Sequence, residues 1–438
     1  MANHSMLRHL LVVGTLLATL VALSTPTLAS VAAKPLDRPS GDSSEFYVPK
    51  PNHGALKQIA DLTSQGRKAD ANLIRELIDT PSSAWVTGGS PKAAEQEVRQ
   101  ITHQAAGKKT VPVLVLYNIP FRDCAQYSAG GATSVAEYEA WIDGVVRGIG
   151  DREAYIILEP DGLGIIPWYT TLDGQLEWCQ PQEADPAAAA AERFAMMNYA
   201  VDALGALPNT RVYLDATHGG WLNVGDITDR LLKAGVQNAD GFFLNASNYQ
   251  WTENLIQYGT WVSSCIAYVT QINPSGFGDC GNQYWSGGPA NNWQGVALDP
   301  ALIWSDDATS VYANTAGINS RYDLILGNVA PTTHFVLDTS RNGQGPWTPT
   351  QSFPDPQTWC NPPARGLGLR PTTDTGNALV DAFLWIKLPG ESDGQCSRGL
   401  GSGNNVVDPI WGRVDPAAGS WFPEQALELA KLANPPLQ

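Results

Sequence analysis

The sequence of 438 residues predicts an α/β protein built on a parallel sheet, which is either covered on both faces or closed into a barrel. The first observation is an alternation of short segments that are apolar throughout with longer amphipathic segments. Strands of a parallel sheet are buried on both faces and form continuous apolar runs, whereas the helices that cover them are amphipathic. The second observation is that the apolar runs end in polar or acidic residues, as strands do when a ligand binds at their carboxyl ends.

Each predicted element rests on its own pattern of apolar residues. Continuous apolar runs predict strands, and apolar positions three and four residues apart predict helices. The predicted strands are 111–120, 154–161, 211–218, 241–247 and 334–340, while 377–391 fits either a strand or a helix. The predicted helices are 55–65, 93–106, 134–149, 186–207, 226–236 and 422–433.

Two segments, 259–306 and 394–420, break this alternation. Both are rich in glycine and small polar residues and show no clear period. Long irregular segments of a compact domain are usually lids or binding loops. We therefore expect both segments to lie beside a binding site.

The N-terminus has the pattern of a secretion signal. Arg8 precedes a short apolar run, and small residues follow near Ala29 and Ala32, where cleavage is expected. A membrane anchor is the alternative reading, but the apolar run is short for a span. We therefore predict a signal peptide over 1–32, a short linker over 33–45, and a secreted, extracellular protein that does not span a membrane.

Charge and cysteine spacing exclude two classes of ligand. The net charge of −16 argues against nucleic acid, which requires a basic surface. The cysteines contain no C-x2-C pair of the kind that binds zinc. An even number of cysteines in a secreted chain predicts disulfides, but six cysteines allow 15 connectivities. They are Cys124, Cys179, Cys265, Cys280, Cys360 and Cys396.

Charged residues follow the predicted strands and are expected to share one mouth of the sheet. Clustered carboxylates raise each other's pKa, so that one of them can act as a general acid near neutral pH. Neighbouring cations hold the remaining carboxylates ionised, and one protonated acid beside one ionised acid is the machinery of glycoside hydrolysis. We interpret Glu159 as structural, because it points to the other face of its strand. The residues are Asp123, Asp161, Asp215, Asp338 and Asp393, with Arg122, Arg341 and Lys387 as the cations.

Several motifs resemble glycoside hydrolase family 6, the inverting cellulases. The segments VLYNIPFRDCAQYSAGG and IILEPD resemble the two signatures of this family, and five further motifs follow in the family's order. The resemblance extends over 46–438, which we predict to be the catalytic domain. Gly162, Thr217 and the insertion 259–306 depart from the family pattern. The five further motifs are LDATHGGW, LNASNYQW, DTSRNGQGP, WCNPPARGLGLRP and DAFLWIKLPGESDG.

The resemblance implies a distorted seven-stranded parallel β/α barrel, similar to a TIM barrel, with an active-site cleft at the carboxyl ends of the strands. It implies Asp161 as the general acid and Asp123 as the residue that raises its proton affinity. Asp393 is the implied base, and a water chain past Ser128 toward Asp123 is the alternative route for the proton. Tyr117 is implied to crowd the central sugar and favour its distortion.

The resemblance also implies the residues that bind substrate. Tryptophans at three motif positions are expected to stack on sugar rings, and polar residues are expected to bind sugar hydroxyls or orient the acids. A metal at Asp215 and His218 would rest on a lone D-x-x-H pattern, so we predict neither metal nor cofactor. The substrate-binding set is Trp85, Asp215, His218, Trp221, Asn245, Asn248, Trp359, Lys387 and Glu391.

The family has two bridges, which imply the pairs Cys124–Cys179 and Cys360–Cys396. Cys265–Cys280 would then close the insertion. The predicted function is a secreted, monomeric, endo-acting β-1,4-glucanase that binds cellulose chains. The alternatives are a cellobiohydrolase whose segments 259–306 and 394–420 roof the cleft, a non-catalytic carbohydrate-binding protein, and a retaining glycosidase.

Overall fold

The computed structural model describes residues 45–401 and 405–437, which belong to one unit, Gly41–Gln438. The predicted signal peptide and all of the predicted linker except residue 45 lie outside the described residues. Among the residues that are described, no helix combines the length and the apolar character needed to cross a membrane.

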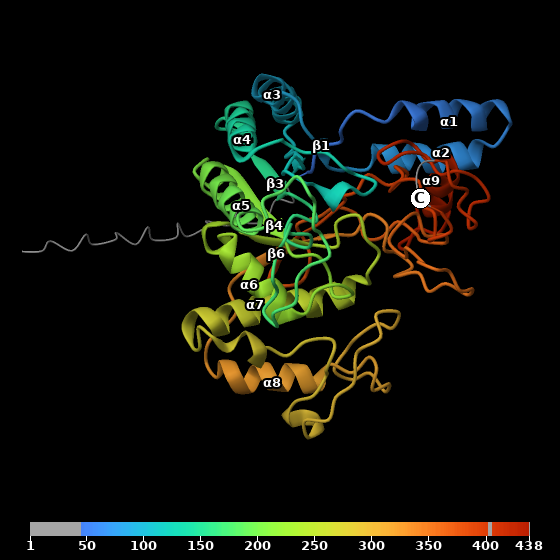
Figure 1. The fold of residues 1–438 in the computed structure, drawn as a ribbon. Helices are drawn as coiled ribbons and strands as arrows, with labels where there is room; N and C mark the ends of the chain where they lie inside the picture. Colours follow the sequence, from blue (N-terminus) through green and yellow to red (C-terminus); the bar gives the residue numbers. More distant parts are fainter. Residues whose placement is uncertain (1–44, 402–404, 438) are drawn as a thin grey trace, which may run out of the picture. The chain divides into compact units, whose positions relative to one another are not determined.

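The described residues form one sheet of seven parallel strands in sequential order, which confirms the predicted α/β barrel class (Figure 1). Every neighbouring pair is parallel, as when Leu116 pairs with Leu158 and Leu158 pairs with Leu214. The strands are β1 (Ala84–Val86), β2 (Val113–Leu116), β3 (Ala154–Leu158), β4 (Thr210–Asp215), β5 (Gly241–Leu244), β6 (His334–Asp338) and β7 (Val380–Leu384).

The barrel is incomplete, because within the described ranges no ladder pairs β1 with β7. A few hydrogen bonds join the two edges instead. The Ser83 N–H donates to the carbonyl of Trp385 at 3.0 Å, and the indole N–H of Trp85 donates to the carbonyl of Ile386 at 2.9 Å. The sheet therefore curls into a barrel that is closed by side chains and loops along one seam.

Alternating side chains of the strands build two cores. On β2, Leu114 and Leu116 pack under the helices, whereas Val113 and Val115 point into the barrel. This alternation is the period of two that a strand imposes, and burial on both faces explains the continuous apolar runs of the sequence.

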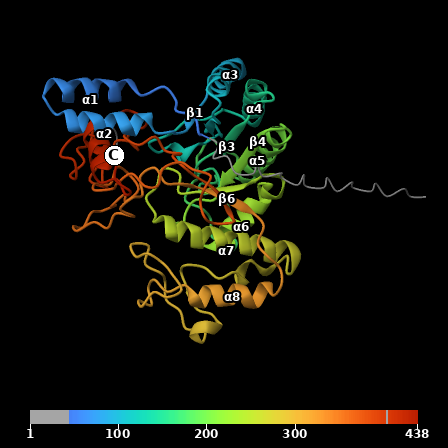
Figure 2. The ribbon, with the colours of Figure 1, turned by 180° about the vertical axis from the view of Figure 1, so that it is seen from behind.

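Helices surround the sheet, with α3 to α7 following one another around its outside (Figures 1 and 2). Helix α8 packs on α7, and α1, α2 and α9 pack together. The helices are α1 (His53–Ser64), α2 (Lys68–Asp79), α3 (Pro91–Gly107), α4 (Val135–Ile149), α5 (Ala189–Gly205), α6 (Val224–Lys233), α7 (Thr252–Gln271), α8 (Ala316–Leu326) and α9 (Pro423–Lys431). Short 3₁₀ turns cover Asp123–Ala125, Val236–Asn238, Gly276–Asp279 and Pro289–Asn291.

The prediction that 259–306 is irregular throughout is wrong at its start, because α7 continues to Gln271. Serines, threonines and aromatic residues lower the intrinsic helix propensity of this stretch, but most of its side chains are buried and packing decides the conformation. The irregular segment begins at residue 272. The ambiguous stretch 377–391 contains strand β7, and the sequence patterns missed α2, α8 and the three-residue β1.

All three predicted disulfides are present, as Cys124–Cys179, Cys265–Cys280 and Cys360–Cys396. The first joins the loop after β2 to the loop after β3. The second joins α7 to the irregular segment that follows it. The third joins the loop that precedes β7 to the loop that follows it.

Candidate active site

A cleft of about 1010 Å³ lies at the carboxyl ends of the strands. The loop after every one of the seven strands contributes to its wall, because parallel strands bring their carboxyl ends to one side of a sheet. In order from β1 to β7, the contributions include Thr87, Asp123, Asp161, His218, Asn248, Trp347 and Lys387.

The acid Asp161 stands in this wall two residues after the buried Glu159. Both residues have positive φ, 62° for Asp161 and 54° for Glu159, so the chain turns sharply as β3 ends. Backbone strain of this kind is concentrated at functional sites. Burial raises the pKa of Asp161 well above its usual value, and the negative charges of Asp215, Asp123 and Asp393 raise it further.

The carboxylate of Glu159 faces away from the cleft and accepts the N–H groups of Asn118 and Ile119 at 2.9 and 3.0 Å. These bonds tie the end of β3 to the end of β2. The structural interpretation of Glu159 agrees with this position.

The second acid of the wall, Asp123, lies in a loop that backbone contacts hold in shape. Its Oδ2 accepts the N–H of Ser128 at 2.7 Å. Burial raises the pKa of Asp123 to about 6, although this hydrogen bond and the charge of Arg122 oppose the rise. The Arg122 guanidinium donates to the carbonyls of Thr87, Tyr117 and Ser128 and lies 4.6 Å from the centre of the Tyr117 ring. Arg122 therefore acts mainly as a brace for the loop.

The third acid, Asp393, has the opposite environment. Its Oδ2 accepts bonds from Arg341 Nη1 at 2.9 Å and from the Tyr249 hydroxyl at 3.1 Å. Lys387 Nζ lies 3.5 Å from its Oδ1. Burial would raise the pKa of Asp393, but the charges of Arg341 and Lys387 outweigh burial and hold the pKa below its usual value. One wall therefore carries a carboxyl that favours the proton and a carboxylate that resists it.

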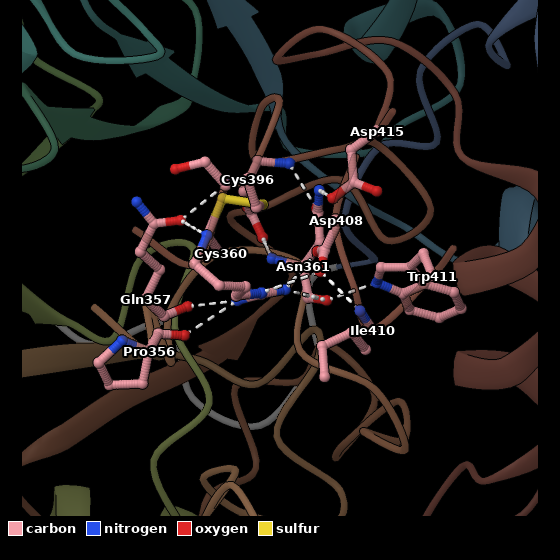
Figure 3. Close-up of polar contacts among 12 residues, drawn as sticks. Pro356, Gln357, Cys360, Asn361, Cys396, Asp408, Ile410, Trp411 and Asp415 are labelled. Atoms are coloured by element: carbon pink, nitrogen blue, oxygen red, sulfur yellow. Dashed lines mark hydrogen bonds and ion pairs between the residues drawn. A yellow bond between two sulfur atoms is a disulfide. The ribbon is translucent and has the colours of Figure 1, made fainter. Parts of the chain in front are cut away.

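The buried Asn361, which Figure 3 shows with Asp415 and Trp411, fixes the backbone around Asp393. The Asn361 N–H donates to Asp393 Oδ2 at 3.0 Å, and the Asn361 side-chain oxygen accepts the N–H of Asp393 at 2.8 Å. The Asn361 amide also donates to Asp415 at 2.8 Å, and its carbonyl accepts the indole N–H of Trp411. Two residues of the irregular segment 394–420 thus hold Asn361, which in turn holds Asp393.

Three possible metal ligands meet in this region, namely Cys396, Asp408 and Asp415. They do not suit a metal. The sulfur of Cys396 is bonded to Cys360, and both oxygens of Asp408 accept bonds from the buried Arg398, at 3.2 and 2.7 Å. Burial and the neighbouring Asp408 raise the pKa of Asp415 to about 7, even though Asn361 stabilises its charge.

Most residues of the predicted site line the cleft, but two do not. Asp215 and Asn245 are buried beneath it. Asp215 accepts the N–H groups of Leu163 and Gly164 at 3.2 and 3.1 Å and so positions the loop that carries Asp161. Asn245 donates to the carbonyl of Asp338 at 2.8 Å and accepts the N–H of Gln250. The predicted residues that do line the cleft are Asp161, Asp123, Asp393, Tyr117, Ser128, Trp85, His218, Trp221, Asn248, Trp359, Lys387 and Glu391.

His218 lies in the wall as a neutral side chain. Burial lowers its pKa to about 4, and its Nδ1 accepts the N–H of Gly220 at 3.1 Å. Asp338, which was also expected at the mouth, is buried and accepts backbone N–H groups from Ser247 and Lys387. Asp338 therefore links the loop after β5 to the loop after β7.

Two further tryptophans line the cleft, Trp178 and Trp347, and neither was predicted from the sequence. Trp178 is 54% exposed and directly precedes Cys179, whose disulfide holds it beside the loop of Asp123. Trp347 directly follows the motif DTSRNGQGP. The sequence signal for Trp178 was its place next to a predicted disulfide, and the signal for Trp347 was its place next to a motif.

Both irregular segments touch the cleft, but over short stretches. The segment after α7 contributes Asp299, Pro300 and Ala301, and the segment 394–420 contributes Ala418 and Gly419. Both segments therefore lie beside the cleft, and their role as binding loops stays a prediction.

Comparison with known proteins identifies the family of this chain. The model of the family described as "Glycosyl hydrolases family 6" matches residues 42–433. The chain therefore belongs to glycosyl hydrolase family 6.

Curated relatives include both endoglucanases and cellobiohydrolases. Endoglucanase A of Cellulomonas fimi is 32% identical over 88% of this chain, which spans only 63% of that relative's length. Endoglucanase 1 of Streptomyces halstedii is 31% identical over 95% of this chain and 97% of its own. A probable 1,4-beta-D-glucan cellobiohydrolase C of Aspergillus niger is 31% identical over 81% of this chain and 69% of its own.

Among solved structures, the endoglucanase Cel6 from Mycobacterium tuberculosis is similar with a TM-score of 0.61 and 31% identity, over 90% of this chain and 98% of its own. That protein was solved with methyl-cellobiosyl-4-deoxy-4-thio-beta-D-cellobioside. The cellobiohydrolase Cel6A from Chaetomium thermophilum, at 22% identity and a TM-score of 0.57 over 90% of this chain and 98% of its own, shares the fold.

Proposed function

We propose that the protein is a secreted, inverting β-1,4-glucanase that hydrolyses cellulose within its chains. The observation that carries the proposal is a pair of carboxyl groups in one cleft whose pKa values are shifted in opposite directions. The pKa of Asp161 is raised and that of Asp393 is lowered. Family membership supplies the substrate class, because the relatives named above are endoglucanases and cellobiohydrolases.

Asp161 is the proposed general acid. Its carboxyl proton passes to the glycosidic oxygen as the bond to the anomeric carbon breaks, and the leaving chain departs as an alcohol. A water molecule attacks the anomeric carbon from the opposite face, so the configuration inverts. Tyr117, in the wall beside Trp85, restricts the space for the sugar and favours a distorted ring.

The water must lose a proton, and the surroundings of the two candidate bases favour Asp123 over Asp393. Arg341 and Lys387 lower the proton affinity of Asp393, which makes it a weak base. Asp123 keeps a higher proton affinity, with a pKa of about 6 that burial sets. We therefore favour the route in which the proton moves through water past Ser128 to Asp123, and assign Asp393 to electrostatic stabilisation of the positive charge that develops on the sugar.

The remaining residues of the wall are proposed to bind glucan. Lys387 and Glu391 offer hydrogen bonds to sugar hydroxyls, and exposed indole faces offer stacking surfaces. Asp215 and Asn245 are proposed to position loops, because both are buried beneath the wall. The proposed stacking residues are Trp85, Trp178, Trp221, Trp347 and Trp359.

The decisive experiment is the variant Asp161→Asn, assayed on carboxymethylcellulose and on cellotetraose. Loss of the general acid should lower kcat by about 10²–10⁴-fold and leave adsorption to cellulose intact. Asp173→Asn, in an exposed part of the loop after β3, is the matched control and should keep wild-type turnover. Unchanged turnover of Asp161→Asn would refute the acid assignment, and a wild-type protein that binds but never hydrolyses would be a carbohydrate-binding protein.

The stereochemistry is tested by proton NMR of the first product formed. Inversion requires the α-anomer to appear before mutarotation. A β-anomer that appears first would identify a retaining enzyme and contradict the proposed water attack.

Endo action is proposed because the two irregular segments contribute only 299–301 and 418–419 to the cleft wall among the residues described. A roof over the cleft, as in the cellobiohydrolase alternative, should need longer contributions. Viscosity of carboxymethylcellulose should therefore fall steeply at low release of reducing sugar. A slow fall of viscosity at the same release would favour the cellobiohydrolase.

Secretion and a monomeric state complete the proposal. Three disulfides are typical of an oxidising compartment outside the cytosol. Recovery of the protein from the culture medium, with a new N-terminus near residue 33, would support secretion. Light scattering during gel filtration tests the monomer.

A further inference from the structure

Three large aromatic side chains within residues 284–293 are exposed on the irregular segment between α7 and α8, which also exposes Tyr312 further along. Tyr284 is 48% exposed, Trp285 is 38% exposed and Trp293 is 46% exposed. We call these three residues the aromatic strip. Exposed tryptophans next to one another are unusual on a soluble protein and mark sites that bind something.

The segment that carries the strip is firmly attached to the barrel. Its beginning is tied to α7 by the disulfide Cys265–Cys280. The buried Gln283 donates through its amide to the carbonyls of Gly219 and Leu222 at 2.9 and 2.8 Å. The strip is therefore held in a fixed place relative to the loop after β4.

The two indoles of the strip are also held in orientation. A Cβ atom at Gly287 would lie 2.2 Å from Cη2 of Trp285, so the ring lies flat against that glycine. The Arg321 guanidinium, on α8, lies 6.0 Å from the ring centre of Trp285 and 5.8 Å from that of Trp293. Because the rings are ordered before any ligand arrives, binding costs little conformational entropy.

The strip is continuous with the cleft. The Tyr284 hydroxyl donates to the carbonyl of Trp221 at 2.7 Å, and Trp221 is part of the cleft wall. Further along, the same segment supplies Asp299, Pro300 and Ala301 to that wall. Because Tyr284 contacts Trp221 and directly precedes Trp285 in the chain, we expect a ligand that extends out of the cleft past Trp221 to reach Tyr284 before the indoles.

The chemistry of the strip fits a neutral sugar polymer. Flat indole faces suit the apolar faces of pyranose rings, and the Arg321 guanidinium between them offers donors to hydroxyl groups at the ring edges. The net charge of −16 disfavours an anionic polymer on this surface.

We propose that the aromatic strip is a second binding site for β-1,4-glucan, which holds a chain of the substrate outside the cleft on the side of Trp221. The proposal rests on the proposed function, because it takes the cleft itself to be a glucan site. The strip adds nothing to bond cleavage. It raises the residence of the enzyme on insoluble cellulose.

The test compares wild type with the double variant Trp285→Ala/Trp293→Ala. Adsorption to microcrystalline cellulose at 4 °C should weaken by about tenfold, because two stacking faces are lost. Cellotetraose is too short to reach from the cleft to the two indoles. Its kcat/KM should therefore stay within about twofold of wild type. Trp285→Phe/Trp293→Phe keeps aromatic faces and should retain most of the adsorption.

Two controls separate binding from folding. Leu56→Ala removes an apolar side chain that is 45% exposed on α1 and should change neither measurement. The single variant Trp293→Ala spares the ring that packs on Gly287 and should lower adsorption with an unchanged melting temperature.

Unchanged adsorption of the double variant would overturn the proposal. So would an equal loss on cellotetraose and on cellulose, which would show that the strip only supports the cleft. If light scattering shows that wild type is a dimer and the double variant a monomer, the strip is an interface between copies and the proposal is also wrong. A wild type that adsorbs through the strip but hydrolyses nothing would contradict the proposed function alone.

Discussion

Asp161, Asp123 and Asp393 are the same amino acid in one cleft, yet their neighbours give them three different proton affinities. Asp161 is enclosed beside other carboxylates, Asp123 keeps a partner N–H and Asp393 is paired with two cations. Desolvation and like charges raise a carboxyl pKa, whereas cations lower it. Residues distant in sequence therefore set the chemistry of Asp161 and Asp393, whereas the polar partners of Asp123 are its near neighbours Arg122 and Ser128.

The pH dependence of activity should report Asp123. If ionised Asp123 accepts the proton from water, kcat/KM should fall as the pH drops below about 6, the pKa to which burial raises this group. Burial and the neighbouring acids raise the pKa of Asp161 well above its usual value, which favours the protonated form that a general acid needs. Asp123→Asn should lower kcat/KM and remove this acidic limb, as measured by initial rates between pH 4 and 9. A limb at the same pH in Asp123→Asn would assign it to another group.

The same enclosure that raises the pKa of Asp161 should destabilise the fold at high pH. A carboxyl whose pKa is raised on folding contributes its stability below the unfolded-state pKa, and loses that contribution as the pH rises through the folded-state pKa. Asp161→Asn removes the charge and should raise the melting temperature at pH 9 by about 1–3 °C, with almost no change at pH 4. Asp173→Asn serves as the control, and a uniform shift at both pH values would contradict the electrostatic cause.

At the scale of elements, the loops after the strands are held by covalent and polar ties. The bridges Cys124–Cys179 and Cys360–Cys396 anchor loops near the cleft, and buried carboxylates such as Asp215 and Asp338 accept backbone N–H groups from neighbouring loops. Positive φ angles at Asp161, Thr217 and Asn245 show that the turns at the strand ends are strained. Such strain persists only where the surrounding contacts fix it.

The bridge Cys265–Cys280 should be the most informative tie to remove, because it also anchors the aromatic strip. The variant Cys265→Ala/Cys280→Ala frees a loop with a sequence separation of 15 and should lower the free energy of unfolding by about 3 kcal/mol. Denaturant unfolding measures this loss. Turnover of cellotetraose at 20 °C should be retained, and its loss would show that the bridge also shapes the cleft.

At the scale of the whole described unit, the open seam between β1 and β7 is the place where the barrel departs from a closed one. Hydrogen bonds from Ser83 and Trp85 to the backbone after β7 replace the missing ladder. The seam lies next to the cleft, because Trp85 also belongs to the cleft wall.

A single seam bond can be tested with Ser83→Ala. The Ser83 hydroxyl donates to the carbonyl of Ile386 and is fully buried, so its removal should lower the free energy of unfolding by about 1 kcal/mol. Ser64→Ala, at the exposed end of α1, should have a negligible effect. Urea denaturation monitored by tryptophan fluorescence measures both, and an equal effect of the two variants would remove the special role of the seam.

The sequence by itself determined the alternation of buried strands and amphipathic helices, the acids at the strand ends and, through its motifs, the family and the three disulfides. These features are local, because a segment such as YIILEPD contains both the continuous apolar run of a buried strand and the acid at its end. Tertiary structure alone decided which acids face the cleft and which, like Asp215 and Asp338, lie beneath it. It also decided that α7 is helical to Gln271, and that Trp178 and Trp347 reach the wall. In each case the deciding energy comes from burial and from partners far along the chain, which no local pattern of residues records.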